Sequence, residues 1–377
     1  MRTLFIEYSY LNGNGGGIYA ARTHINLFAE LSESMTLFYP YKKGKEAEEI
    51  LEGNIKMIPV EDKRSKIRKF FDLLVGKVHR YKFDSKLFDT ALYDVVVFDN
   101  SVVSSRMIKR FKQAGVKTIT IHHNYQIEYL KGDSSRLTLL PQLFWTLVYE
   151  GDAVRNSDLN ITLTHQDAEL LRKHYCTTAK FAVLGVFEYK RIERKNVANK
   201  KSNHNYVISG SLATKQTEDS LISWIQEYYP LLKVFDNQAI LTIAGRSPSS
   251  KLTKLVFDCG IKLIPSPSNL HAIVSESDYY ICPINRGGGL KLRIMDGLKA
   301  GLPVLTHEVS ARGYEKLIDK VFVISYNDQE SFRRGLSILV KNNSKEVIQS
   351  TYNSLFCYDA GIATLSQILQ TNHFLNI

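Results

Sequence analysis

The sequence predicts an α/β protein made of two doubly wound domains, each a parallel sheet covered by helices. A chain of 377 residues that is 44% hydrophobic and 11% aromatic is long and apolar enough to bury two cores of ordinary size. Short β-rich runs alternate with amphipathic helical patterns, as in βαβ units. A polar stretch interrupts this alternation, which then restarts. We therefore expect one domain at residues 1–190, a linker at 191–205, a second domain at 206–350 and a helical tail at 351–377.

The first half alternates strands with helices along its whole length. Its strands are expected at residues 3–8, 35–40, 55–58, 94–98, 117–121, 159–163 and 180–184. Its helices are expected at residues 18–31, 62–92, 137–156 and 166–175, with another that ends at 115. In the first of these helices, apolar residues recur at the spacing of one helical face.

The second half repeats the pattern. Its strands are expected at residues 206–212, 239–246, 261–264, 278–283, 303–306 and 321–324. One helix is expected at residues 290–301 and another is expected to end at residue 340. The tail is expected to be helical at residues 352–369.

Charge and cysteine content restrict the class of protein. Lysine and arginine number 49 against 38 acidic residues, a net charge of +11 that favours an anionic partner. The four cysteines are far apart and no secretory signal begins the chain, which favours a cytoplasmic location. No apolar run approaches the ~18 residues that span a bilayer, so we expect any membrane contact to be peripheral. A nucleic-acid partner is not expected, because no helix-turn-helix, zinc or aromatic RNA motif accompanies the charge.

The glycine triplet Gly287, Gly288 and Gly289 follows a predicted strand and precedes a helical pattern that starts at Leu290. Such a junction presents free backbone N–H groups and the positive end of a helix dipole, which favour an anion such as a diphosphate. Lys291 and Arg293 add positive charge, and Asp296, about one turn along the helix, can accept hydrogen bonds from sugar hydroxyls.

A second glycine loop follows the first strand and contains Gly15, Gly16 and Gly17. It is similar to the loop of a nucleotide-binding βαβ unit, but it lacks both the full dinucleotide fingerprint and the Gly-Lys-Ser/Thr of a P-loop. A simple turn is the alternative interpretation.

His122 and His123 stand at the carboxyl end of the strand at residues 117–121. Ligands of open parallel sheets bind at that edge, so we expect both side chains to point toward a ligand. No cluster with metal-ligand spacing and no Asp-x-Asp occurs, which predicts chemistry without a metal ion.

Two strings carry a family resemblance. Residues 285–304 resemble the nucleotide-sugar site of the retaining GT-B glycosyltransferases of family four, which have a glycine-rich loop, basic residues, an acid and Ala-x-Gly-x-Pro-Val in this order. Residues 122–129 resemble the His-Asn-x-x-x-x-Tyr segment of the same enzymes. The chain departs from that pattern at Gly288, which replaces the first acid of the family, and at Asp296, which replaces a glutamate.

The resemblance implies the GT-B fold, two facing Rossmann-like domains with the active site in the cleft and a last helix that crosses back to the first domain. It implies that His123, with His122 beside it, contacts the transferred sugar, and that Lys291 and Arg293 stabilise the leaving diphosphate. The donor-binding residues that it implies are Gly15, Gly16, Gly17, Ser211, Lys215, Gly245, Arg246, Ser266, Gly287, Gly288, Gly289, Lys291 and Asp296.

The function implied is retaining, metal-independent transfer of a sugar from a nucleotide-diphosphate sugar, with UDP or GDP as the nucleotide and no separate cofactor. The acceptor would be a saccharide or a lipid-linked saccharide, in the assembly of cell-envelope polysaccharide or glycolipid. A non-catalytic sugar-nucleotide-binding or scaffold protein of the same fold is the alternative.

Residues 62–92 combine a predicted helix with many lysines and arginines. An apolar stripe beside a basic face suits a helix that lies on an anionic membrane. A surface helix that packs its apolar face onto its own domain is the alternative.

Overall fold

A computed structural model describes residues 1–13, 15–42, 54–76, 89–101, 107–133, 136–191, 204–318, 320–341 and 344–375. The chain divides into two compact units. Unit 1 comprises Met1–Ile192 and Phe356–Ile377, and unit 2 comprises Glu193–Leu355. Most of the expected linker, residues 192–203, lies outside the described residues.

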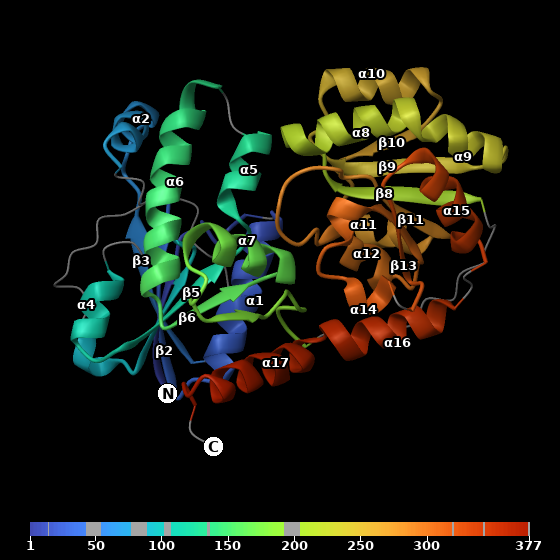
Figure 1. The fold of residues 1–377 in the computed structure, drawn as a ribbon. Helices are drawn as coiled ribbons and strands as arrows, with labels where there is room; N and C mark the ends of the chain where they lie inside the picture. Colours follow the sequence, from blue (N-terminus) through green and yellow to red (C-terminus); the bar gives the residue numbers. More distant parts are fainter. Residues whose placement is uncertain are drawn as a thin grey trace. The chain divides into compact units, whose positions relative to one another are not determined.

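Unit 1 contains a sheet of seven parallel strands in the order β3-β2-β1-β4-β5-β6-β7 (Figure 1). Its strands are β1 (Arg2–Glu7), β2 (Ser34–Tyr41), β3 (Ile55–Glu61), β4 (Val95–Asp99), β5 (Lys117–His122), β6 (Leu159–Thr162) and β7 (Phe181–Val183). The register of β1 and β4 pairs Glu7 with Asp99 at the carboxyl ends of both strands.

Helices connect these strands and cover the sheet. They are α1 (Gly16–Glu30), α2 (Lys66–Leu74), the 3₁₀ turn η2 (Thr90–Leu92), α4 (Ile108–Gln113), α5 (Gln126–Asp133), α6 (Arg136–Asn156), α7 (His165–Tyr175) and α17 (Tyr358–Thr371). The central strands are buried on both faces, as expected of a parallel sheet between helices. Phe5 and Val97 pack with α1 and α17 on one face, and Ile6 and Phe98 pack on the other.

Unit 2 contains six parallel strands in the order β10-β9-β8-β11-β12-β13. These are β8 (Asn205–Ser211), β9 (Ile240–Arg246), β10 (Lys262–Pro265), β11 (Tyr279–Cys282), β12 (Val304–His307) and β13 (Val323–Tyr326). Its helices are α8 (Lys215–Glu227), α9 (Tyr229–Phe235), α10 (Ser250–Asp258), α11 (Leu270–Ser275), α12 (Arg293–Lys299), α13 (Glu308–Ala311), α14 (Glu315–Ile318), α15 (Gln329–Leu339) and α16 (Lys345–Phe356). Trp224 and Tyr206 are buried at the centre of its largest apolar cluster.

The strand positions and the α/β class predicted from the sequence are confirmed, with strand ends that differ by at most three residues. The prediction was wrong for the long basic helix at residues 62–92. Within the described residues, α2 ends at Leu74, because Gly76 has a φ of +71° and turns the chain, and residues 77–88 lie outside the described part.

The tail is two helices, not one. Cys357 separates α16 from α17, and its Sγ accepts a hydrogen bond from the backbone N–H of Ala360 at the start of α17. The residue between the helices is therefore a cap, which ends the first helix and starts the second. None of the helices in the described part of the chain is long and apolar enough to cross a lipid bilayer.

The last helix is part of the core of unit 1. Leu365 and Leu369 of α17 are fully buried beside Ile25 and Phe28 of α1, and the hydroxyl of Tyr358 donates to the carbonyl of Asn26 at 3.0 Å. Thus a segment more than 300 residues away in the sequence completes the face of the sheet that α1 covers.

We predict that Leu365→Ala lowers the free energy of unfolding of unit 1 by ~2–5 kcal/mol, because it removes a fully buried side chain and leaves a cavity. Equilibrium urea unfolding measures this change. Val347→Ala is the matched control: this side chain on α16 is 52% exposed, so its loss should change stability by less than ~0.5 kcal/mol. Equal stability of the two variants would show that α17 does not contribute to the core.

Candidate functional site

Several of the predicted donor residues lie where the strand order of unit 2 reverses. β8 has β9 on one side and β11 on the other, so the connections after β8 and β11 leave toward opposite faces of the sheet. Ser211 ends β8, and the chain after β11 leads into the glycine triplet. Open α/β sheets bind ligands at such reversals.

The glycine loop has a backbone that only glycine adopts easily. Gly287 and Gly289 have φ values of +83° and +72°. A Cβ on Gly287 would lie 2.5 Å from Oε1 of Gln216, so the end of that side chain would have to move. The positive φ of Gly287 is therefore the main reason for glycine at this position.

The helix after this loop begins later than the sequence predicted. α12 begins at Arg293 instead of Leu290, so Lys291 belongs to the loop. The cause is a tight turn: Ile294 donates to the carbonyl of Lys291 at 3.1 Å and Met295 donates to that of Leu292 at 2.9 Å, which are the three-residue bonds of a 3₁₀ turn.

Both predicted cations are fixed against backbone carbonyls. Nζ of Lys291 lies 2.8 Å from the carbonyl oxygen of Gly288 and 3.2 Å from that of Gly287. Nη2 of Arg293 donates to the carbonyl of Ser211 and to Oγ1 of Thr217, both at 3.3 Å. Arg293 therefore joins the end of β8, the first turn of α8 and the glycine loop, and it brings positive charge to the reversal point.

Lys215, expected in a loop, is the first residue of α8, because the side chain of Thr214 caps this helix. Its ammonium pairs with Asp219 at 2.8 Å, and Nη1 of Arg286 lies 3.5 Å from the same carboxylate. Arg286 was not among the predicted site residues, although its place directly before the glycine triplet makes it a third basic residue of this loop.

Gly245 and Ser266 form one backbone connection at the ends of β9 and β10. The N–H of Ser266, whose φ is +47°, donates to the carbonyl of Gly245 at 2.7 Å. A Cβ on Gly245 would overlap the carbonyl oxygen of Gly210 and lie 2.9 Å from Cγ of Leu212. Packing of β9 on β8 therefore requires glycine at position 245, whether or not a ligand binds there. Arg246, the last residue of β9, is exposed.

Asp296 lies in the first turn of α12, as expected. The negative charge of Asp296 adds to the effect of burial and raises the pKa of the neighbouring Tyr280. The Tyr280 hydroxyl thus stays protonated and shares a hydrogen bond of 2.9 Å with the hydroxyl of Ser209.

Unit 1 has its own reversal point, between β1 and β4. The loop after β1 leads to Gly15, which precedes the first turn of α1, and the buried Arg22 holds this loop through bonds to the carbonyls of Leu11 (2.5 Å) and Gly13 (3.0 Å). A Cβ on Gly17 would lie 4.0 Å from Nδ1 of His123. The glycine loop and His123 are therefore neighbours.

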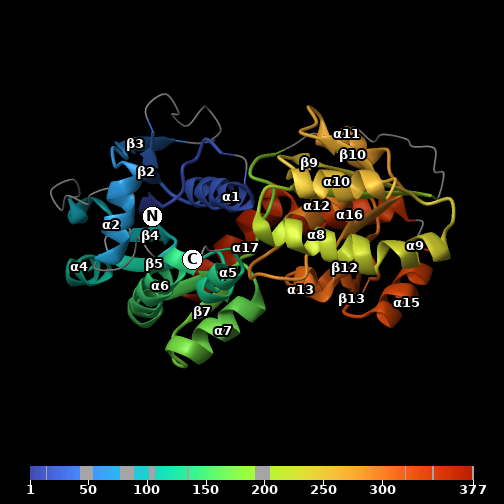
Figure 2. The ribbon, with the colours of Figure 1, turned by 90° about the horizontal axis from the view of Figure 1, so that it is seen from above.

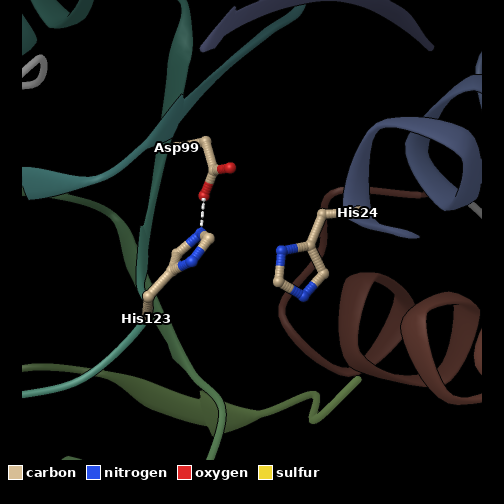
Figure 3. A group of neighbouring side chains, drawn as sticks. All are labelled: His24, Asp99 and His123. Atoms are coloured by element: carbon tan, nitrogen blue, oxygen red, sulfur yellow. Dashed lines mark hydrogen bonds and ion pairs between the residues drawn. The ribbon is translucent and has the colours of Figure 1, made fainter. Parts of the chain in front are cut away.

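A buried ion pair fixes the ring of His123 (Figure 3). Its Nε2 lies 2.5 Å from Oδ1 of Asp99 at the end of β4. Burial alone would lower the pKa of His123, but the charge of Asp99 and this hydrogen bond outweigh burial and raise it. Burial would likewise raise the pKa of Asp99, and the charge and hydrogen bond of His123 lower it to about 2. The charge of Asp99 thus favours the protonated form of His123, whose Nε2 is occupied by this bond.

Glu7 and His24 complete this buried group as neutral side chains. Burial, together with the neighbouring charge of Asp99, raises the pKa of Glu7 well above its ordinary value. Burial lowers the pKa of His24 to about 4, and its Nε2 bonds to the carbonyl of Gly185 at 3.1 Å. Glu7, His24 and Asp99 were not among the predicted site residues. Glu7 and Asp99 lie at the carboxyl ends of β1 and β4, whereas His24 lies within a helix and nothing in the sequence marks it.

His122 lies elsewhere, which corrects the expectation that both histidines point toward a ligand. It is 2% exposed, its Nε2 bonds to Oδ1 of Asn160 on β6 at 2.9 Å, and its ring is near Phe181. Successive residues of a strand point to opposite faces, so the side chains of His122 and His123 lie on different faces of the sheet. Burial lowers the pKa of His122 to about 4, and we assign it a packing role.

One group of side chains in the described part of the chain could hold a metal ion. One ligand atom from each of His24, Asp99 and His123 lies within 4.8 Å of the others. However, the 2.5 Å separation of Nε2 of His123 from Oδ1 of Asp99 is that of a charge-assisted hydrogen bond, in which both atoms point at a shared proton. We interpret the group as an ion pair with a neutral histidine beside it.

Comparison with known proteins agrees with this organisation. Residues 203–342 match the family model described as glycosyl transferases group 1. Over 189 residues the chain is 27% identical to an uncharacterized 44.6 kDa protein in the cps region of Klebsiella pneumoniae. This match covers 46% of the chain and 47% of that protein, so the chain spans about half the length of the curated relative it matches.

Solved structures of similar fold cover nearly the whole chain. Sucrose-phosphate synthase from Thermosynechococcus elongatus has a TM-score of 0.66 at 11% identity, over 98% of both chains. WaaG, a glycosyltransferase involved in lipopolysaccharide biosynthesis, has a TM-score of 0.64 at 15% identity, over 98% of this chain and 99% of that one. HepE from Anabaena, in complex with UDP and glucose, has a TM-score of 0.59 at 10% identity, over 98% of this chain and 100% of that one.

Two Rossmann-like units with these structural neighbours define a GT-B glycosyltransferase fold. The match to the glycosyl transferases group 1 family model lies within the second unit.

We predict that Asp99→Asn lowers the pKa of His123 from above to below the ordinary value of ~6.5, because burial remains and the opposing charge is lost. A raised folded-state pKa stabilises the protein fully below that ordinary value, and the effect disappears as the pH rises through the pKa of folded His123. The variant should therefore lose this pH-dependent part of the free energy of unfolding.

NMR titration of the His123 ring protons measures the change. Asp152→Asn on α6 is the control, because Asp152 bonds to Asn156 within its own helix. The same pKa of His123 in wild type and Asp99→Asn would contradict the ion pair.

Proposed function

We propose that the chain transfers a hexosyl or related group, with retention of configuration and without a metal ion, from a UDP- or GDP-sugar to a saccharide or a lipid-linked saccharide. The process would be the assembly of cell-envelope polysaccharide or glycolipid. The observation that carries the proposal is the glycine loop with Lys291 and Arg293 at the reversal point of unit 2, inside the group 1 domain.

The named relatives support the donor and the process. HepE was solved with UDP and glucose, WaaG acts in lipopolysaccharide biosynthesis, and the Klebsiella relative is encoded in a cps region. The net charge of +11 fits a donor that carries a diphosphate.

Cleavage of the bond between the anomeric carbon and the diphosphate oxygen sends the electron pair to that oxygen. Negative charge therefore grows on the leaving group in the transition state. Cations and N–H groups that are already fixed in place stabilise this charge without reorganisation. In our proposal the cations are Lys291, Arg293 and Lys215, and the N–H groups are those of residues 287–289. The carbonyl contacts of Lys291 and Arg293 limit their motion before the donor arrives.

His123 is proposed to donate its Nδ1–H to a hydroxyl of the transferred sugar. Asp99 acts as a positioning residue, because its bond to Nε2 fixes the ring and keeps it protonated. Asp99 and Glu7 at this edge are both buried, so neither is offered as a nucleophile. We therefore favour attack of the acceptor oxygen on the face that the diphosphate leaves, with the acceptor proton passing to the leaving phosphate oxygen.

The alternative is a protein of this fold that binds sugar nucleotides without turnover, and the glycine at position 288 in place of the family's first acid motivates it. A panel of UDP-, GDP-, ADP- and CMP-sugars distinguishes the two functions. Binding of a donor without release of its nucleotide, in the presence of a range of acceptors, would favour the alternative.

We predict that Lys291→Ala and Arg293→Ala each lower the turnover rate by at least ~100-fold, because each removes a fixed cation beside the leaving phosphate. Nucleotide release from the donor identified in the panel measures this rate. Lys299→Ala, at the opposite end of α12, is the matched control and should retain wild-type turnover. Circular dichroism establishes that each variant is folded. A folded Arg293→Ala enzyme with turnover close to that of wild type would sink the assignment.

We also predict that EDTA leaves the rate of transfer unchanged, because fixed cations replace the metal ion at the diphosphate. The rate is measured after dialysis against EDTA and again after addition of Mg²⁺ or Mn²⁺. Loss of transfer that either ion restores would overturn the metal-independent mechanism and would direct attention to His24, Asp99 and His123.

A further inference from the structure

α2 exposes its apolar face to solvent, whereas an ordinary surface helix buries that face. Ile67, Phe70, Phe71 and Leu74 recur at the spacing of one helical face, and they are 44% to 72% exposed. The buried residue of this helix is instead the carboxylate Asp72. Surface helices normally turn their apolar stripe toward the core. The stripe of α2 therefore needs another partner.

A second apolar stripe lies on α6. Leu140, Phe144, Leu147 and Val148 share one face of this helix and are 41% to 75% exposed. The opposite face is buried in unit 1, as Glu150 and several apolar residues show. One face of α6 thus packs into the core, and a second apolar face is exposed to water.

The two helices lie side by side (Figures 1 and 2). The hydroxyl of Tyr149 on α6 donates to the carbonyl of Gly76 just after α2, and a Cβ on Gly76 would lie 2.7 Å from ring atoms of Trp145. We name the two stripes together the α2–α6 surface. Scattered exposed apolar residues are common, but two adjacent helical stripes form a patch of the kind that binds a partner.

The charge around α2 is modest. Residues 61–75 contain five basic side chains and three carboxylates, a surplus of two positive charges. Asp62 pairs with Arg64 and Lys69, and Asp72 pairs with Arg68. The surplus favours an anionic partner, whereas a second copy of the chain would bring two positive surfaces together. The apolar side chains must then supply most of the binding free energy.

The α2–α6 surface belongs to the edge of unit 1 that carries His123. α2 follows the carboxyl end of β3, and α5 and α6 follow the carboxyl end of β5, where His123 stands. We propose that this surface docks onto an anionic lipid bilayer and that the acceptor of unit 1 is lipid-linked. The choice of acceptor rests on the proposed glycosyltransferase function, but the docking does not.

Sedimentation with vesicles tests the docking. The wild type is mixed with vesicles of phosphatidylcholine alone and of phosphatidylcholine with phosphatidylglycerol. The test variant is Phe70→Ser, Phe71→Ser and Phe144→Ser combined. The matched control is Phe257→Ser with Val234→Ser, which removes side chains that are 83% and 86% exposed in unit 2.

We expect the wild type and the control to bind the anionic vesicles and the test variant to bind them at least ~10-fold more weakly, because each phenyl ring withdrawn from water strengthens partitioning by about this factor. All the changed side chains are exposed, so thermal unfolding should stay the same. Equal binding by the test variant, or no binding by the wild type, would overturn the proposal. A wild-type dimer in light scattering that the test variant lacks would assign the surface to a second copy and would also overturn it.

Nucleotide release from the donor in the absence of vesicles separates this proposal from the proposed function. The test variant should release nucleotide at the wild-type rate when the acceptor is water-soluble. Vesicle binding that the variant loses, in a protein that transfers no sugar, would refute the enzymatic proposal alone. Normal transfer with equal vesicle binding by wild type and variant would refute the docking alone.

Discussion

In each unit the strand order reverses once, beside β1 in unit 1 and beside β8 in unit 2, and this constraint decides where polar groups can collect. Parallel strands require right-handed crossovers, so connections on the two sides of a reversal lie on opposite faces of the sheet. The loops separate there, and the backbone amides at the strand ends are left for a ligand. In unit 2 this place holds the glycine triplet and Arg293. In unit 1 it holds Asp99 and the loop before α1.

The same topology also places two carboxyl groups next to each other in a buried site. The register of β1 and β4 brings Glu7 and Asp99 together at two adjacent strand ends, and both are buried. Two carboxylates in one dry site cannot both ionise at low cost. Glu7 keeps its proton, while Asp99 is ionised because His123 supplies the opposite charge. The pair is thus preorganised, and the conformation of His123 depends on two strands other than its own.

Much of the fold follows from local signals, and much of the site does not. Runs of β-branched and aromatic residues located the strands, and the glycine triplet located the loop between β11 and α12, because both depend on neighbouring residues in the sequence. The Asp99–His123 pair depends on which strands are adjacent, and no local pattern contains that information. The same limit explains His122: its position in the sequence is as favourable as that of His123, but the alternation of the strand turns it into the core against Asn160.

A count of the basic residues in the segment after β3 overstates the positive charge of its surface, because several of them pair with carboxylates. Asp62 is buried, and its pKa is lowered although burial opposes this, because Arg64, Lys69 and Tyr10 donate hydrogen bonds to it. Each cation used in this way is fixed by its carboxylate and contributes less to attraction at a distance. In α2 the residue that faces the unit is Asp72, whose carboxylate pairs with Arg64 and Arg68, and the apolar stripe lies on the exposed side. The buried ion pairs and the exposed apolar stripe are therefore two features of the same orientation of the helix.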